Sequence, residues 1–326
     1  MKSFWGRCLG LGILVVLGVA CSAGGNGDDN PPPPPYKYFA YVASRYASNV
    51  SAYSINTATG DLRAVAGSPF AAGDAPLSLA VDPSGKFVYV VDFLSSRVLA
   101  YSINAATGAL TAVAGSPFAT GDYPESVAVD PSGKFAYIAN AFSDDVSAYS
   151  INTATGSLTA VPGSPFGAGD SPVSVSVIPS GKFAYAVNGG TDNVSAFSID
   201  AATGALAAVA GSPFSAGASP VSIAVTPSGK FAYVANEGSE NVSAFSINAA
   251  TGALTAGAGS PLGAGSYPGF LAVDPSGRFV YVPNHGLDSI SVFAINAATG
   301  ALTEIAGSPF AAGFAPRYIA IVRIAQ

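Results

Sequence analysis

The strongest constraint on the fold of this chain is a 48-residue repeat that fills most of its 326 residues. Successive copies carry no insertion or deletion, and they begin at Tyr38, Lys86, Lys134, Lys182, Lys230 and Arg278. A fixed period of this length is typical of proteins built from stacked supersecondary units. We therefore expect residues 38–326 to form one domain in which each unit packs against its neighbours.

Each copy predicts four β-strands. In the copy that begins at Lys134, residues 135–139 and 146–151 alternate large and small side chains and are rich in aromatic and β-branched types. A weaker strand is expected at 157–162 and a fourth at 173–178. Pro179, Ser180 and Gly181 then form a turn in which the glycine supplies a positive φ. Four antiparallel strands in a unit of about 40–50 residues are typical of a β-propeller blade.

The predicted fold is therefore an all-β propeller of six four-stranded blades. The first copy opens with a second-strand sequence at 38–42, and the last copy ends with a first-strand sequence at 317–322. We expect this C-terminal strand to join the N-terminal blade and close the ring, because closure removes an exposed strand edge. A β-solenoid is the alternative architecture.

The N-terminus predicts export. Lys2 and Arg7 precede an apolar run over residues 8–20 that is too short for a comfortable transmembrane helix and is typical of a secretory signal peptide. Residues 17–21, LGVAC, resemble a bacterial lipobox, although Gly18 departs from the usual pattern. The resemblance implies that residues 1–20 are removed and that Cys21 is acylated; ordinary signal cleavage nearby is the alternative.

Residues 21–37 are rich in glycine and contain five consecutive prolines, which predicts an extended tether. Together with the lipobox this implies a protein anchored by lipid in a bacterial cell envelope, at the outer membrane and facing the periplasm or the surface. The lipid would be its only membrane contact.

Composition narrows the function classes. Only 10% of the residues are charged and the formal net charge is −6, which argues against nucleic acid as a partner. Both cysteines lie in the first 21 residues, so the repeats are held by packing alone. No motif for a cofactor or a metal is found, and we expect a monomer.

The copies differ mainly in the loops of one rim, here called the upper face, where acidic residues gather, and we assign Asp92 to this acidic surface. Asp74, Asp122 and Asp170 occupy equivalent positions that could hold a cation or an amine, or could be exposed turn residues. Aromatic residues near the same mouth suit a saccharide or peptide, or pack against loop prolines. The candidate ligand-binding residues are Asp74, Asp122, Tyr123, Glu125, Asp170, Tyr267, Asp288 and Phe314.

The run GSPFATGDYPESVAVDPSGKFAYIAN at 115–140 resembles the lactonase-type β-propeller family, which includes the cycloisomerase-type 6-phosphogluconolactonases and is usually seven-bladed. Residues 234–237 and 284–290 are similar to segments of its functional region. The resemblance implies His285, Glu237 and Arg317 as catalytic candidates. The chain departs from the family pattern at His285 and Leu287, where the family has Arg and His, and at Gly269 and Phe270, where it has an acidic residue and His.

Two functions follow from these patterns. The first is a binding module without catalysis that holds a small molecule, a glycan or an envelope protein on its acidic, aromatic upper face. The alternative is a lactone hydrolase, which needs a base and a cationic group for the oxyanion. A purely structural envelope protein is a third interpretation.

Overall fold

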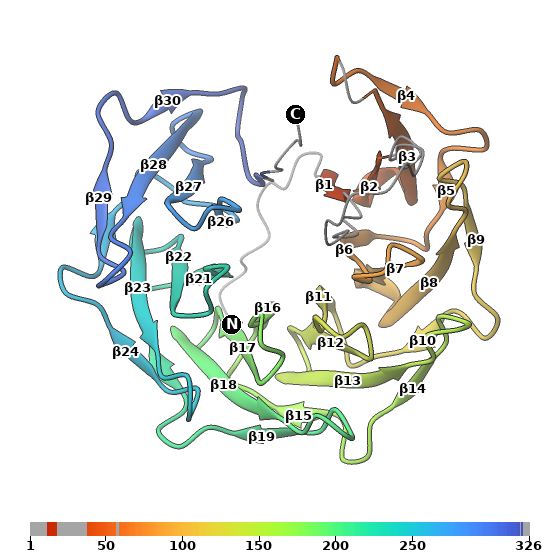
Figure 1. Cartoon of the computed structure of the whole chain (residues 1–326), viewed down its shortest axis with the longest axis horizontal. Coiled ribbons are helices and arrows are strands. Elements are labelled where there is room, and N and C mark those ends of the chain that lie inside the picture. Colours follow the sequence, from red (N-terminus) through yellow and green to blue (C-terminus); the bar gives the residue numbers. More distant parts are fainter. Residues whose placement is uncertain (1–11, 18–37, 57–58, 320, 322–326) are drawn as a thin grey trace, which may run out of the picture.

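The computed structural model describes residues 12–17, 38–56, 59–319 and 321, and these form six antiparallel sheets of five strands each (Figure 1). The first sheet contains β1 (Gly12–Leu17), β2 (Tyr38–Ser44), β3 (Asn49–Ile55), β4 (Leu62–Ala64) and β5 (Phe70–Ala71). The second contains β6 (Pro76–Val81), β7 (Phe87–Asp92), β8 (Arg97–Ile103), β9 (Leu110–Ala112) and β10 (Phe118–Ala119). The third contains β11 (Pro124–Val129), β12 (Phe135–Asn140), β13 (Asp145–Ile151), β14 (Leu158–Ala160) and β15 (Phe166–Gly167).

The other sheets repeat this order. The fourth contains β16 (Pro172–Val177), β17 (Phe183–Asn188), β18 (Asn193–Ile199), β19 (Leu206–Ala208) and β20 (Phe214–Ser215). The fifth contains β21 (Pro220–Val225), β22 (Phe231–Asn236), β23 (Asn241–Ile247), β24 (Leu254–Ala256) and β25 (Leu262–Gly263). The sixth contains β26 (Ala272–Val273), β27 (Phe279–Asn284), β28 (Ser289–Ile295), β29 (Leu302–Glu304) and β30 (Phe310–Ala311). Two short 3-10 turns occur at Arg45–Ala47 and Phe93–Ser95.

The sheets stand around a common centre, with β6, β11, β16, β21 and β26 innermost (Figure 1). In the third sheet the strand order is β11-β12-β13-β14, and β15 pairs with the end of β13. This confirms the predicted all-β repeat and the four strands of each copy. The fifth strand was not predicted, because two residues are too few to show a periodic pattern.

The hydrophobic core lies between the sheets. Along β12 the odd-numbered residues Phe135 and Tyr137 pack toward the fourth sheet, while Ala136 and Ile138 pack toward the second. A strand with both faces buried reads as a nearly continuous apolar run, as these strands do. Five such clusters join successive sheets from the first to the sixth.

A tyrosine and a glycine join each of these sheet pairs, in an arrangement that we call the Tyr–Gly clasp. The Tyr137 hydroxyl donates a hydrogen bond of 3.0 Å to the carbonyl oxygen of Gly204, which lies in the next copy. The Phe135 ring lies beside the same glycine, where a Cβ would come within 2.2 Å of the ring. The glycine is therefore required by close packing as well as by its φ of +77°. The other clasps are Tyr41–Gly108, Tyr89–Gly156, Tyr185–Gly252 and Tyr233–Gly300.

The predicted hairpin turn is also present. Gly181 has a φ of +70°, and its N–H donates to the carbonyl oxygen of Ile178 at 2.9 Å. In the second sheet the equivalent turn is strengthened by the Asp82 carboxylate, which accepts hydrogen bonds from the N–H groups of Lys86 and Phe87, both at 2.7 Å.

The two ends of the array differ from the prediction. The inner edge of β2 is paired with β1, not with the C-terminal strand. Tyr318, which belongs to the predicted closing strand, instead forms a parallel bridge with Phe270 beside the sixth sheet. β1 pairs with the edge of β2 that the prediction gave to residues 317–322, so the structure does not show the predicted closure. Cys21 and the whole predicted tether, residues 21–37, lie outside the described residues.

Candidate functional site

Glu125 is the titratable group that the fold places most distinctively. The pairing of β11 with β12 shifts between Pro124 and Ser126, so Glu125 lies at a β-bulge and has no partner in the register. Bulges redirect a side chain and are frequent next to active sites. The equivalent bulges in the second, fourth and fifth sheets carry the apolar residues Leu77, Val173 and Val221. A carboxyl group thus replaces an aliphatic side chain on one inner strand.

The surroundings of Glu125 change its acidity. The residue is half-buried, and its burial raises the pKa of the carboxyl to about 7. The positive charges of Arg317 and Arg45 act in the opposite direction and favour the carboxylate. At neutral pH such a group exists in both protonation states, which suits proton transfer.

A row of aromatic rings positions Arg45. This arginine begins the 3-10 turn after β2, and its guanidinium carbon lies 4.6 Å from the centre of the Phe93 ring. Phe93 contacts Tyr123, with ring centres 4.9 Å apart, and Tyr123 contacts Phe142 at 5.6 Å. Cation–π contact and these packed rings hold the guanidinium over the first three sheets. Sequence reasoning did not place Arg45 in the site, although no other copy has an arginine at this repeat position.

Arg317 is held by the backbone of the sixth sheet. Its carbonyl oxygen accepts a hydrogen bond of 2.8 Å from the Phe270 N–H, and the Tyr318 ring stacks on Phe270 at 4.2 Å. A Cβ at Gly269 would lie 2.4 Å from that carbonyl oxygen. Gly269 and Phe270, which interrupt the family pattern, therefore have a physical role here, because they hold the segment that carries Arg317.

Glu237 and His285 occupy equivalent positions on the fifth and sixth sheets. Their N–H groups bond to the carbonyl oxygens of Ser219 and Tyr267, at 2.9 and 3.0 Å, and both side chains are half-buried. The repeat gives the same position to Arg45, Phe93, Ala141 and Gly189. Within the described part of the chain, no hydrogen bond or ion pair joins Glu237 to His285. The catalytic roles that the resemblance implied for Glu237 and His285 stay a prediction.

The three equivalent aspartates are exposed on the rim. Asp74 accepts a hydrogen bond of 2.6 Å from the Ser95 hydroxyl, and Asp122 accepts one of 3.1 Å from Ser96. Asp170 is also exposed. Among the described residues, no group of three or more His, Cys, Asp or Glu side chains is arranged to hold a metal ion. The serine hydrogen bonds of Asp74 and Asp122 are typical of carboxylates in exposed turns.

Asp288 connects neighbouring parts of the rim. Its carboxylate accepts a hydrogen bond of 2.7 Å from the Ala315 N–H, 27 residues further along. Asp144 and Asp192 bond in the same way to the N–H groups of Ser171 and Ser219. The repetition shows that this aspartate fixes the rim loops.

Asp92 was assigned to the acidic surface, and that assignment is wrong. The side chain is fully buried and accepts a hydrogen bond of 2.9 Å from Arg97 Nε. It also accepts one of 2.9 Å from the Ala75 N–H. Two predicted aromatic residues, Tyr267 and Phe314, are exposed, whereas Tyr123 is half-buried within the aromatic row.

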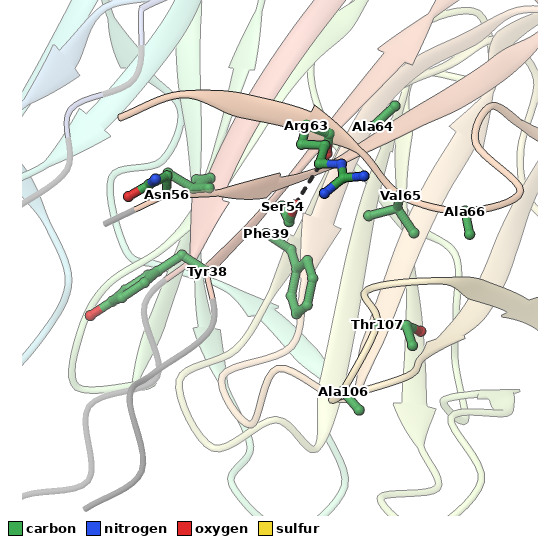
Figure 2. A pocket seen from close by; sticks show the side chains of 11 residues that line it. Tyr38, Phe39, Ser54, Asn56, Arg63, Ala64, Val65, Ala66, Ala106 and Thr107 are labelled. Carbon is green, nitrogen blue, oxygen red and sulfur yellow. Dashed lines mark hydrogen bonds between the residues drawn. The ribbon is translucent and has the colours of Figure 1, made fainter. Parts of the chain in front are cut away.

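Two cavities lie away from these residues. One of about 610 Å³ lies between the first and second sheets, with Arg63, Tyr38 and Phe39 among its lining residues (Figure 2). Its lining offers a single charged group, so it lacks an acid–base pair. An apolar groove of about 460 Å³ lies on the sixth sheet. In the described part of the chain no helix is long and apolar enough to cross a membrane.

Solved structures with similar folds include three bacterial proteins. The periplasmic gluconolactonase of Pseudomonas aeruginosa matches with a TM-score of 0.74 and 19% identity over 90% of this chain and 87% of its own. A functionally unknown protein of Desulfotomaculum acetoxidans matches with a TM-score of 0.66 and 17% identity over 84% of both chains. A putative 6-phosphogluconolactonase of Bacteroides uniformis matches with a TM-score of 0.57 and 19% identity over 84% of this chain and 96% of its own. At these identities the likeness concerns the fold alone.

Comparison of the sequence with protein families identifies the family of this chain. No match was found among curated protein sequences. The family described as lactonase, seven-bladed β-propeller, matches residues 35–119, 115–177 and 167–323, which together span nearly all of the repeats. The chain therefore belongs to the lactonase family of β-propellers.

Proposed function

We propose that this protein hydrolyses a lactone at the upper end of its inner strands, with Glu125 as the general base. The observation that carries the proposal is the carboxyl group at the β11 bulge, which has a pKa raised to about 7 and lies within the electrostatic influence of two arginines. A titratable group perturbed by burial and by specific charges is a candidate for catalysis. Membership of a lactonase family supports the same reaction class.

The chemistry needs only the groups that this chain supplies. The Glu125 carboxylate accepts a proton from water, and the hydroxide so formed attacks the lactone carbonyl carbon. The carbonyl oxygen becomes an oxyanion, which Arg45 or Arg317 stabilises. The ring C–O bond then breaks, and the leaving alkoxide takes the proton back from Glu125. The product is an open-chain hydroxy acid, whose carboxylate is also complementary to the guanidinium groups.

His285 and Glu237 have a different role in this proposal from the one that the resemblance implied. Both occupy the same position of the repeat as Arg45, and they make no hydrogen bond to each other. They contact hydroxyl groups of a polyhydroxylated lactone, since imidazole and carboxylate groups donate and accept hydrogen bonds to such groups. The proposed substrate class is therefore a sugar-derived lactone.

A second function, binding without chemistry, is favoured by one observation. Tyr267 and Phe314 remain exposed on the upper face, as a glycan or peptide site would require. In this alternative Glu125 and the arginines bind a ligand without turnover.

The test is hydrolysis of a panel of sugar lactones by the purified chain, followed by proton release. We expect turnover that Glu125→Gln and the paired loss of Arg45 and Arg317 abolish, and that His285→Ala weakens mainly through KM. Asp170→Asn is the matched control, because this carboxylate is exposed on the same rim. Binding of a lactone or glycan without hydrolysis would favour the second function, and neither binding nor hydrolysis would refute both.

Export and lipid attachment remain part of the proposal. The charged residues before the apolar run, together with Cys21 and the tether, support a mature, monomeric protein that is anchored in the cell envelope. Metabolic labelling with a fatty acid tests this, because Cys21→Ser should remove the label. A label that persists in that variant would contradict it.

A further inference from the structure

Three exposed apolar side chains on the upper face take no part in the proposed chemistry. Tyr46, Leu94 and Phe142 occupy one repeat position on the first three sheets, and they are 62%, 58% and 71% exposed. Single exposed apolar residues are ordinary on a protein surface, but three at one repeat position on successive sheets form a patch. Such a patch indicates a contact with another molecule.

The fold does not require large side chains at this position. In the other three sheets the same position holds Gly190, Gly238 and Gly286. There the neighbouring loop lies close, because a Cβ at Gly190 would come within 3.0 Å of Asp170 and one at Gly286 within 2.8 Å of the Tyr267 ring. The turn therefore forms around glycine in three sheets and carries exposed apolar groups only in the other three.

Ring contacts join the exposed side chains into a continuous row. The guanidinium carbon of Arg45 lies 6.0 Å from the Tyr46 ring centre and 4.6 Å from that of Phe93. Phe93 contacts Tyr123, and Tyr123 contacts Phe142. We call this row the apolar strip, and its members are Tyr46, Phe93, Leu94, Tyr123 and Phe142.

The apolar strip borders the groups to which we assign catalysis. Arg45 lies between two of its rings, and Tyr123 lies two residues before Glu125, on the loop that leads into β11. A substituent of a bound lactone can therefore lie on the strip while the carbonyl group is held near Arg45 and Glu125.

The charges at the Phe142 end of the strip favour an uncharged substituent. The Phe142 N–H donates a hydrogen bond of 3.2 Å to the carbonyl oxygen of Asp122, and Asp144 follows two residues later. Both aspartates are exposed, and among the described residues neither forms an ion pair. Their negative charges repel an anionic group such as a phosphate, whereas an alkyl or aryl group avoids this repulsion.

The size of the patch suits part of a small molecule. An aromatic side chain can bury about 150–250 Å², so the three exposed side chains together offer on the order of 400 Å². A stable protein interface buries about 800 Å² on each partner. The patch is therefore too small for a second copy of this chain or for another folded protein.

We propose that the apolar strip binds an alkyl or aryl substituent of the lactone, so that the substrate is amphipathic: a hydroxylated lactone ring that carries an uncharged apolar group. The ring and its reaction rest on the proposed function, and the apolar group rests on the strip. The hydroxyl groups face Glu237 and His285 on the fifth and sixth sheets, and the apolar group lies on the first three. Removal of that group from water stabilises the complex.

Three lactones that differ at one position test this substrate class: glucono-1,5-lactone, its 6-O-octyl ether and its 6-phosphate. We expect kcat/KM for the octyl ether to exceed that for the parent lactone at least tenfold, because burial of two methylene groups already gives a preference of about tenfold. The phosphate should be the poorest of the three. Equal values for the octyl ether and the parent, or a preference for the phosphate, would overturn the proposal.

Glycine variants assign the preference to the strip. The double change Leu94→Gly and Phe142→Gly copies the turn of the other three sheets, and it should bring the ratio of kcat/KM for octyl ether and parent close to one. The ratio is taken within each variant, so a general loss of activity does not affect it. Leu62→Ala is the matched control, because Leu62 is 52% exposed in β4 and lies outside the strip. A tenfold preference that survives in the double variant would contradict the assignment.

Calorimetric binding of the three product acids separates this inference from the proposed function, because it needs no turnover. Tighter binding of the octyl acid than of gluconate, lost in the double variant, would support the strip even if no lactone were hydrolysed. Hydrolysis without any preference for the octyl group would leave the proposed function standing and overturn the inference. So would a chain that elutes as a dimer and becomes monomeric in the double variant, since the strip would then hold a second copy.

Discussion

The sharpest structural prediction uses two glycines with the same backbone conformation and different neighbours. Gly60 and Gly204 have φ values of +78° and +77°, so replacement by alanine strains both backbones equally. The strain is about 1–2 kcal/mol, and it is partly offset because alanine restricts the unfolded chain by about 0.4–1 kcal/mol. Gly60→Ala should therefore destabilise the chain by no more than about 1–2 kcal/mol.

Gly204→Ala adds a clash that Gly60→Ala does not. Its Cβ would lie 2.2 Å from the Phe135 ring, and that ring is buried between two sheets, so it cannot move aside without cost. Overpacking of this kind costs about 1–3 kcal/mol. Gly204→Ala should therefore be the more destabilising substitution by about 1–3 kcal/mol.

Equilibrium urea unfolding followed by circular dichroism measures both variants, since the only tryptophan, Trp5, lies outside the repeats. Equal free energies of unfolding for the two variants would contradict the structure, in which Gly204 is closely packed and Gly60 is not.

Three further predictions concern charged and close-packed positions. Arg97→Ala should lower the free energy of unfolding by about 3 kcal/mol, because it leaves the buried Asp92 carboxylate without its cation. The double change Asp92→Asn and Arg97→Asn should cost far less in the same urea assay, because it reproduces the pair found in the fourth sheet. Burial raises the pKa of Glu125 to about 7, above its unfolded value of about 4.3. The free energy of unfolding of the wild type should therefore fall as the pH rises between these two values. In urea titrations Glu125→Gln should remove that fall. Gly269→Ala should displace the backbone of Arg317 and reduce lactone turnover, and normal kinetics in this variant would contradict the role given to that segment.

The repeat explains why so much of the fold could be predicted. Alternation within residues 134–181 identified the four strands and the turn at Gly181, because those features depend on neighbours in the sequence. The Tyr–Gly clasp could not be found in this way, since it joins residues 67 positions apart in two different copies. The fifth strand of each sheet was missed because two residues carry no period.

The candidate site was predicted in part. Glu125 and Arg317 were both named from the sequence, but their electrostatic connection depends on the bulge and on the sixth sheet, which no spacing reveals. Asp92 was misplaced on the surface because burial of a carboxylate depends on its partner, Arg97. His285 and Glu237 were named by resemblance on two successive copies, and the structure places them at equivalent positions of the sixth and fifth sheets; their catalytic roles stay a prediction.

The most direct test of the proposed function is the pH dependence of kcat/KM for lactone hydrolysis, corrected for spontaneous opening of the ring. Glu125 must be ionised to accept a proton from water, so kcat/KM should rise with pH, inflect near 7 and level off above it. Glu125→Gln should abolish the enzymatic rate at every pH. A Glu125→Gln chain that retains the wild-type rate and inflection would contradict the assignment of Glu125 as the base.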